Sequence, residues 1–396
     1  TQSTLNATTG AQVTAGDNIR ITATLADDLV FTLTDRGDVE NSGLTTSVLT
    51  QVAGDFVFAK DINTLFIDYD GNGSLNGNDF QFTITGASAF HDDDIDLYLT
   101  AGGNGESVTA GDGDDSLTGG AGADVLTGDG GADTLTGVGG TNDTLVGGAG
   151  TDSITGLGGN DIIYGDLLAT DDTVGGGNDI IATGAGTNSV RGGAGNDSIT
   201  GGSGADTLHG ENGNDTVTSA AGADSLYGGA GNDTITDAAG ASSIEGGAGN
   251  DSLTGGDDGD TIKGGDGNDT VAGDGGADSV YGDAGDDVIT SGAAADSLHG
   301  GTGNDSLTDA AGASSLNGGA GDDTMIGGAG VDTMTGDTGT DTFDVSDVSL
   351  IANKATITDF SETDDLIKIL AANTTDGTAA GETPVLATET FDSPAD

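Results

Sequence analysis

The sequence predicts an all-β protein in which a parallel β-roll, a two-sheet solenoid of nonapeptide repeats, follows a small β-sandwich domain. Residues from about Ala110 to Asp344 repeat with a period of nine. Glycine accounts for 77 of the 396 residues without the three-residue period of collagen, which indicates another kind of repeat. Because only 4% of the residues are aromatic, the core must be thin and built from Leu, Ile and Val.

Each copy of the repeat combines a glycine turn with a short strand. In Gly228-Gly-Ala-Gly-Asn-Asp-Thr-Ile-Thr236, positions one to six form a turn that ends in Asp, and position eight is the only large apolar residue. Positions seven to nine therefore predict a strand with one inward side chain. Two nonapeptides make one coil, and about 26 of them make about 13 coils, roughly 60 Å long at ~4.8 Å per strand. The coils bury two apolar ladders, one of Ile199, Val217, Ile235 and Leu253 and one of Leu208, Leu226, Ile244 and Ile262.

The first hundred residues follow a different pattern. Apolar and polar residues alternate in the segments 19–25, 29–33, 80–84 and 95–99, which lie between Gly, Asp and Asn residues. A period of two predicts half-buried strands. We therefore expect a β-sandwich domain over residues 1–101, the roll over 102–344, and a capping segment with a tail over 345–396.

One segment of this first domain has the spacing of a calcium loop. Residues 68–79 fit the twelve-residue EF-hand-type pattern, with Gly73 at the sixth position and Leu75 at the eighth. The segment resembles dockerin-like loops, although it ends in Asp rather than Glu, and its flanks predict strands rather than helices. An Asx-rich turn is the alternative. The expected ligands are Asp68, Asp70, Asn72, Ser74 and Asp79.

The repeated pattern G-G-x-G-x-D-x-U-x resembles the RTX (repeats-in-toxin) calcium-binding β-roll, over about 60% of the chain. The resemblance implies Ca2+ as the cofactor, bound between successive coils by Asp side chains and carbonyls of the glycine turns. It also implies export by a type I secretion system and folding outside the cell. The segment that contains Thr342-Phe-Asp-Val345, Ile357-Thr-Asp-Phe360 and Asp365-Leu-Ile-Lys-Ile369 resembles the cap of such rolls.

Alternate nonapeptides differ, so we expect two unequal series of calcium ligands at position six. The first series carries Asp throughout, at Asp161, Asp179, Asp197, Asp215, Asp233, Asp251, Asp269, Asp287, Asp305, Asp323 and Asp341. The second series is Asp152, Thr170, Asn188, Asp206, Asp224, Ser242, Asp260, Asp278, Asp296, Ser314 and Asp332. Further calcium ligands are expected earlier in the roll, at Asp115, Asp124 and Asp133.

The second series predicts a broken row of ions. Four of its members lack a carboxylate, and Ala often replaces the glycine pair, as in Ser219-Ala-Ala-Gly-Ala-Asp224. We expect this replacement to strain the turn, and we expect ions to be missing beside Asn188, Ser242 and Ser314. The segments 225–256 and 297–328 are similar at an offset of four coils, so the gaps at the two Ser residues recur. Inherited drift and a periodic contact patch both explain this recurrence.

The charge excludes several classes of partner. The chain has 67 acidic and 7 basic residues, a formal net charge of -60. Nucleic acids and anionic membranes need a basic surface, so we expect neither as a partner. No segment reaches the length of an apolar transmembrane span. No nucleophile elbow is present and the three His residues are scattered, so we expect no enzyme activity.

Position nine of the second series forms a mixed ladder on the outer surface. Either a solvated row or a contact with another subunit or a carbohydrate explains it. Its members are His209, Tyr227, Glu245, Lys263, Tyr281 and His299.

The sequence favours a structural function. We expect a secreted, calcium-dependent protein at the surface of a bacterium that assembles with copies of itself as an S-layer, sheath or fibre. The alternative is a calcium-rigidified adhesin or surface-binding module, with ice binding as a weaker version. A third interpretation is the C-terminal part of a secreted RTX enzyme.

Overall fold

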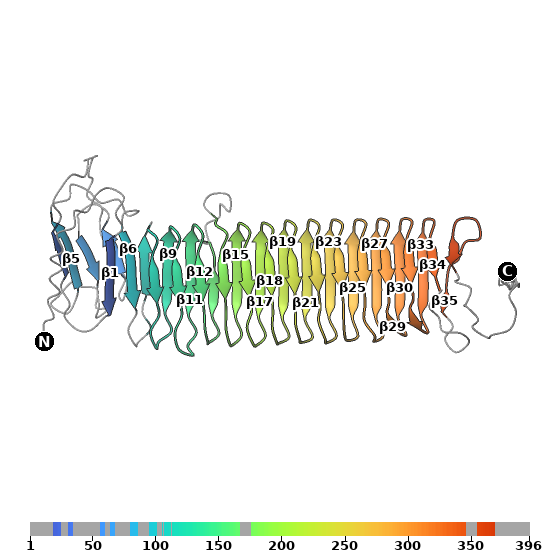
Figure 1. The fold of residues 1–396 in the computed structure, drawn as a ribbon, viewed down its shortest axis with the longest axis horizontal. Coiled ribbons are helices and arrows are strands. Elements are labelled where there is room, and N and C mark those ends of the chain that lie inside the picture. Colours follow the sequence, from blue (N-terminus) through green and yellow to red (C-terminus); the bar gives the residue numbers. More distant parts are fainter. Residues whose placement is uncertain are drawn as a thin grey trace, which may run out of the picture.

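The computed structural model describes residues 105, 107–110, 113–166, 176–345 and 355–368, together with the strand backbone of β1 to β6 and Gly111. The expected calcium loop at 68–79 and the tail from 369 onward lie outside these residues. The described part of the roll is a long rod of stacked coils (Figure 1). The described residues include no helix that could span a membrane.

Two long parallel sheets form the roll, and each coil contributes one strand to each sheet. In spatial order, the larger sheet contains β1 (Ile19–Thr24), β6 (Ile95–Thr100), β8 (Ser116–Thr118), β10 (Thr134–Thr136), β12 (Ser153–Thr155), β14 (Ile180–Ala182), β16 (Ser198–Thr200), β18 (Thr216–Thr218), β20 (Thr234–Thr236), β22 (Ser252–Thr254), β24 (Thr270–Ala272), β26 (Val288–Thr290), β28 (Ser306–Thr308), β31 (Thr324–Ile326), β34 (Thr342–Asp344) and β36 (Leu366–Lys368).

The opposing sheet has longer strands, because most of them continue into the following glycine turn. From the N-terminal end it contains β7 (Ser107–Gly111), β9 (Val125–Gly130), β11 (Thr144–Ala149), β13 (Ile162–Tyr164), β15 (Ser189–Ala194), β17 (Thr207–Asn212), β19 (Ser225–Ala230), β21 (Ser243–Ala248), β23 (Thr261–Asp266), β25 (Ser279–Ala284), β27 (Ser297–Thr302), β30 (Ser315–Ala320), β33 (Thr333–Thr338) and β35 (Thr356–Ile357).

The core consists of the two predicted apolar ladders. Ile199 pairs with Val217 and Leu208 with Leu226, and the same register continues along both sheets. The position-eight side chains of both ladders are at most 1% exposed from Val108 to Phe343. One apolar side chain per strand cannot be buried by a single coil, so each coil is stable only against its neighbours. This confirms the predicted two-sheet roll.

The N-terminal strands join the roll through its larger sheet. β1 pairs with β6 in parallel, and β6 pairs with β8 through Tyr98 and Ser116. A separate sheet contains β2 (Phe31–Thr34), β5 (Phe80–Thr85), β4 (Thr64–Ile67) and β3 (Phe56–Ala59), in that order. A two-stranded sheet pairs β29 (Ala311–Gly312) with β32 (Ala329–Gly330). Strands thus occur in all four segments where alternation predicts them, and also at β3 and β4, where none was expected. The sandwich itself stays a prediction.

The C-terminal segment continues both sheets by one coil. β35 pairs with β33 and β36 with β34. Phe360 packs edge-on against Phe343, with ring centroids 6.3 Å apart. The side chain of Asp359 accepts hydrogen bonds from the main-chain N–H groups of Gly336 and Asp337. These contacts cover the last coil, as a cap would.

The register steps once by three nonapeptides instead of two. Ser153 pairs with Ile180 and Ile162 pairs with Ser189, so the strand register skips one nonapeptide, residues 167–175. Because one nonapeptide is left out of the register, turns of the first predicted series before the step align with turns of the second series after it, and the reverse. Asp152 therefore aligns with Asp179, and Asp161 aligns with Asn188. The predicted order, in which Asp161 precedes Asp179 in one series, is wrong at this step, and Thr170 lies outside the described residues.

Candidate calcium sites along the two turn edges

One edge of the roll carries an unbroken row of buried aspartates, which we call the aspartate edge. Each main-chain N–H in the row donates to Oδ1 of the Asp in the next coil, at 2.7–2.9 Å. The last N–H, that of Asp341, donates to Oδ1 of Asp365 in the C-terminal segment at 3.0 Å. The members are Asp115, Asp133, Asp152, Asp179, Asp197, Asp215, Asp233, Asp251, Asp269, Asp287, Asp305, Asp323 and Asp341.

The opposite edge, which we call the mixed edge, has the same ladder with three substitutions. Asn188 accepts through its amide oxygen, whereas Ser242 and Ser314 accept through their hydroxyl groups. The position-six members are Asp124, Asp143, Asp161, Asn188, Asp206, Asp224, Ser242, Asp260, Asp278, Asp296, Ser314 and Asp332.

Most carboxylates of both edges keep one oxygen without a hydrogen-bond partner. Oδ1 is used by the ladder, and Oδ2 is buried with no donor within reach. A buried charged oxygen without a partner is costly unless a cation or a proton satisfies it. On the aspartate edge, Oδ2 lacks a partner in Asp133, Asp152, Asp179, Asp197, Asp215, Asp233, Asp251, Asp269, Asp287, Asp305 and Asp323. On the mixed edge, it lacks one in Asp143, Asp161, Asp260, Asp278, Asp296 and Asp332.

Glycine at position one leaves room in front of these oxygens. A Cβ on Gly228 would lie 2.3 Å from Oδ2 of Asp233 and 2.5 Å from the carbonyl oxygen of Gly246 in the next coil. Gly264 and Gly282 show the same arrangement. A carboxylate oxygen and a carbonyl oxygen from successive coils therefore face one small space, and both are ligands that calcium prefers.

The glycine turns differ between the edges. On the aspartate edge, positions two and four both have positive φ, as at Gly229 (117°) and Gly231 (133°). Where Glu211 or Asp283 replaces glycine at position two, φ stays positive. On the mixed edge, position two varies: Gly256 has φ of 95° there, whereas Ala238 and its counterparts in the other turns with an Ala pair are not among the residues with positive φ. In the turns with an Ala pair, position four has positive φ, as at Gly240 (125°). The expected strain from the Ala pairs is therefore wrong, because that turn needs positive φ at position four.

Burial raises the pKa of most ladder carboxyls, and neighbouring carboxylates raise it further at many of them, among them Asp133, Asp179 and Asp233. The pKa rises to about 8 at Asp133 and Asp179 and to about 7 at Asp233, Asp260 and Asp287. The main-chain N–H bond to each carboxylate opposes this shift without cancelling it. Without a cation, burial thus shifts the carboxyls of these aspartates toward the protonated form in the folded state.

Position five adds a second ladder on the aspartate edge, in the opposite sense. The N–H of Asn214 donates to Oδ1 of Asn196 in the preceding coil, and the N–H of Asn232 donates to Asn214, both at 2.7 Å. Asp286 takes part in the same way, accepting from Asn304. The sequence shows Asn or Asp at this position, but the opposite directions of the two ladders emerge only from the stacked coils.

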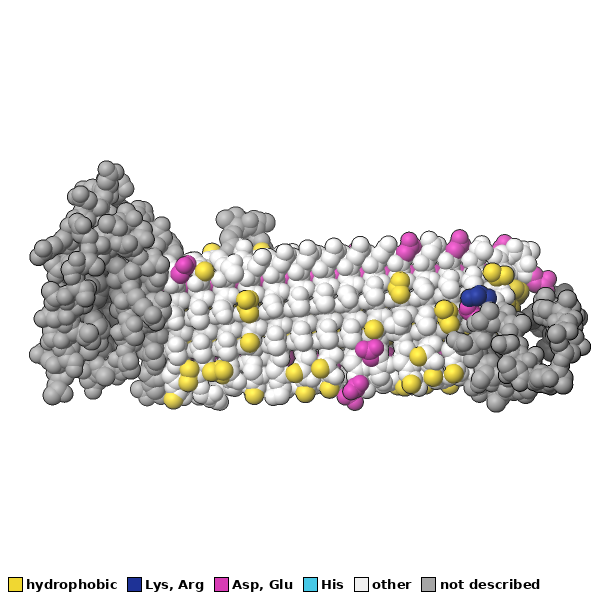
Figure 2. All heavy atoms as spheres, viewed as in Figure 1, with side chains coloured by type: hydrophobic (Ala, Val, Ile, Leu, Met, Phe, Trp, Pro, Cys, Tyr) yellow, Lys and Arg dark blue, Asp and Glu magenta, His cyan; other side chains and the backbone are white. Residues whose placement is uncertain are grey.

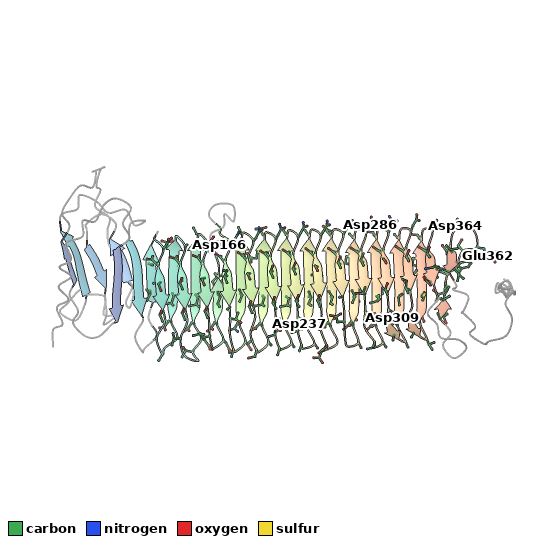
Figure 3. The ribbon with its side chains drawn as sticks, in the orientation of Figure 1. Asp166, Asp237, Asp286, Asp309, Glu362 and Asp364 are labelled. Atoms are coloured by element: carbon green, nitrogen blue, oxygen red, sulfur yellow. The ribbon has the colours of Figure 1, made fainter. Side chains whose placement is uncertain are left out.

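Three buried aspartates of the mixed edge were missed by the sequence reasoning. Asp143 follows a turn with one extra residue, so a strict count of nine passes over it. Asp237 and Asp309 stand at position one, where glycine is usual, and each is 1% exposed. Figure 3 shows both on one long edge of the roll, opposite Asp286. The available signal was a carboxylate in a glycine position of two nonapeptides that lack Asp at position six.

The residues present fit calcium. Among the described residues, no three carboxylate or imidazole side chains gather in one place, so each site must combine carboxylates with main-chain carbonyls. Unpartnered Oδ2 atoms and the space in front of the position-one glycines supply that combination. The ion would be held by the position-six Asp of successive coils, neutralising the stacked charge.

Comparison with protein families agrees with this geometry. The model of the RTX calcium-binding nonapeptide repeat, which spans four copies, matches residues 100–167 and 173–343 in eight partly overlapping stretches. The interruption between these matches coincides with the step in the register. No curated protein matches the chain.

Proposed function

Because the chain belongs to the family of RTX calcium-binding nonapeptide-repeat proteins, we propose that it is a secreted, calcium-dependent structural protein that assembles with copies of itself outside a bacterial cell. Export by a type I system and folding in extracellular calcium accord with this family. An S-layer, sheath or fibre is the expected assembly. The repeat is a calcium-binding scaffold, and the proposal assigns no catalysis to it.

The observation that carries the proposal is the inward placement of the acidic side chains. Twenty-five aspartates of the described residues are buried. If two carboxylates share each divalent ion, about twelve ions neutralise nearly all of this charge. The face shown in Figure 2 is mostly white, the colour of the backbone and of uncharged side chains that are not hydrophobic, with scattered hydrophobic and acidic side chains. A rod of this kind repels its copies far less than a net charge of -60 suggests.

The outer ladder at position nine offers a further contact surface. His209 stacks on Tyr227 with ring centroids 4.4 Å apart, and Tyr281 stacks on His299 at 4.9 Å. Stacked rings present flat, rigid surfaces that lose little entropy on binding. The two stacked pairs support a periodic contact with a neighbouring copy.

Analytical ultracentrifugation across a calcium titration tests the proposal. We expect the chain to be monomeric in chelator and to form large species at saturating calcium, which negative-stain microscopy should show as sheets or fibres. A rod that stays monomeric at saturating calcium and high protein concentration would overturn self-assembly and leave calcium binding intact.

A surface-binding module is the second candidate, and one observation favours it. The outer face of the larger sheet bears Ser or Thr at both outward positions of most strands, as in β10, β18 and β20. Parallel strands space these hydroxyl groups by about 4.8 Å along the rod. Binding of monomeric rods to a polysaccharide or to ice in pull-down assays would support this function.

A further inference from the structure

We propose that the mixed edge contains two additional calcium sites in which a position-one carboxylate replaces the position-six carboxylate: one formed by Asp224, Asp237, Ser219 and Ser242, and its copy formed by Asp296, Asp309, Ser291 and Ser314. The proposal does not depend on whether the chains assemble.

The exchange of residue types is reciprocal between neighbouring coils. One coil carries Ser219 at position one and Asp224 at position six, and the next carries Asp237 at position one and Ser242 at position six. Two ordinary coils bring together two glycines and two carboxylates. This pair brings together two hydroxyls and two carboxylates, so no negative charge is lost.

Contacts within the first set tie the four residues together. The Ser219 hydroxyl donates to Oδ2 of Asp224, and the N–H of Asp224 donates to the Ser242 hydroxyl oxygen at 3.0 Å. Asp237 lies near enough to Asp224 for the two like charges to interact. The set thus presents side-chain oxygens of four residues from two successive coils.

Asp237 supplies the observation that points to a ligand. Its side chain is 1% exposed, and neither Oδ1 nor Oδ2 accepts a well-formed hydrogen bond. Burial raises the pKa of its carboxyl, and this effect is larger than the lowering effects of the Ser242 hydroxyl, the Ala238 main-chain N–H and the Ser219 hydroxyl. An ionised carboxylate in this place requires a cation.

The second set repeats the first after four coils. Asp309 is 1% exposed, its Oδ1 accepts from the Ser291 hydroxyl at 3.0 Å, and its Oδ2 has no partner. The N–H of Asp296 donates to the Ser314 hydroxyl oxygen at 3.0 Å. The same reciprocal exchange therefore recurs, which replaces the expected gaps at Ser242 and Ser314 by sites of another composition.

These sites differ from the ordinary ones in the position of the ion. In ordinary coils the glycine at position one leaves the space in front of Oδ2 open. Here the side chain of a position-one Ser or Asp occupies the space that glycine leaves open. Calcium must therefore bind beyond this side chain, with hydroxyl oxygens in place of some main-chain carbonyls. Hydroxyls are weaker calcium ligands than carboxylates, so these two ions should dissociate first as calcium falls.

Equilibrium dialysis of the full chain with radioactive calcium tests the proposal. The double variant Asp237→Asn/Asp309→Asn should bind two ions fewer per chain than the parent at saturation. A matched control, Asp257→Asn/Asp266→Asn, removes two exposed charges and should leave the number of ions unchanged. An unchanged count in the first variant would overturn the proposal and show that protons satisfy these carboxyls.

A second measurement does not depend on the folding of any variant. Anomalous scattering from crystals of the unmodified chain grown in calcium should place an ion between the carboxylates of Asp224 and Asp237, and another between those of Asp296 and Asp309. Clear ions along the aspartate edge with none at these two places would refute it.

Discussion

The main-chain N–H of Asp215 donates a hydrogen bond of 2.7 Å to Oδ1 of Asp233, one coil further along the roll. This bond uses one carboxylate oxygen for stacking and leaves Oδ2 of Asp233 buried without a partner. Each aspartate of the edge therefore has two roles. It joins its own coil to the preceding one, and it offers an oxygen to an ion.

Removal of calcium should unfold the roll. Unpartnered buried carboxylates repel one another, and a core of one apolar side chain per strand cannot offset the chain entropy without the ions. Circular dichroism should show coil in chelator and β structure in millimolar calcium. A full β spectrum in chelator at neutral pH would contradict this prediction.

Replacement of one carboxylate should weaken folding without breaking the ladder. Asp233→Asn keeps an Oδ1 acceptor and removes the charge that faces the ion. We expect a higher calcium midpoint for folding and a loss of roughly 1–3 kcal/mol in the free energy of unfolding. The control Asp286→Asn, at an exposed position, keeps the acceptor for Asn304 and should change little. Equal effects of the two variants would argue against calcium at Oδ2.

A methyl group at position four should separate two coils. Gly231 has φ of +133°, and a Cβ on it would lie 1.8 Å from the carbonyl oxygen of Gly213. Gly231→Ala should therefore cost on the order of 1–3 kcal/mol from the backbone conformation, besides the steric clash. Thermal unfolding in calcium measures the loss. The control Ala238→Gly, at a position without positive φ, should cost less than about 1 kcal/mol; a tolerated Gly231→Ala would show that the turn can move.

The stability of the calcium-free roll should depend on pH in an unusual direction. Asp133 and Asp179 have a pKa of about 8 in the folded state against 3.8 unfolded, so the folded state binds more protons between these values. Their contribution is fully present below pH 3.8 and is lost as the pH rises through about 8. In chelator, β structure should return on acidification from pH 8 to pH 4.

With calcium present, the trend should reverse. Protons compete with the ion for the same carboxylates, so calcium affinity should fall as the pH is lowered. Calcium titrations at several pH values, followed by circular dichroism, measure both trends. Calcium-free spectra that do not change with pH would contradict the role of these carboxyls.

One neutral gap should remain on the mixed edge. Thr183 occupies position one and Asn188 position six of the same turn, and both are buried. With no carboxylate from this turn, we expect no ion beside it. Thr183→Gly/Asn188→Asp restores the ordinary pattern and should add one bound ion per chain in equilibrium dialysis. An unchanged number would mean that Asn188 already takes part in a site.

The repeat unit could be predicted from the sequence because its physics is local. An apolar residue at position eight of each nonapeptide and glycine in the turn define the ladders that pair Ile199 with Val217. Long-range register could not be predicted in the same way. A strict period of nine includes residues 167–175 as one nonapeptide of the stack, although they contain no G-G-x-G turn. Asp237 was missed for a different reason. Its partners Ser219 and Asp224 lie in the preceding coil, and only stacking brings them together.

The register step across residues 167–175 limits how such a chain can change length over generations. A duplication of one nonapeptide that entered the stack would exchange the two edges for every coil after it, and each turn would then meet neighbours of the wrong shape. Insertion of an even number of nonapeptides keeps each turn on its own edge. The similar segments 225–256 and 297–328 are related in this way, since they lie four whole coils apart. An odd increment keeps the match only where the surplus nonapeptide stays out of the register, as it does between Asp152 and Asp179. The difference between the two edges therefore allows the stack to change length by even numbers of nonapeptides and excludes odd numbers.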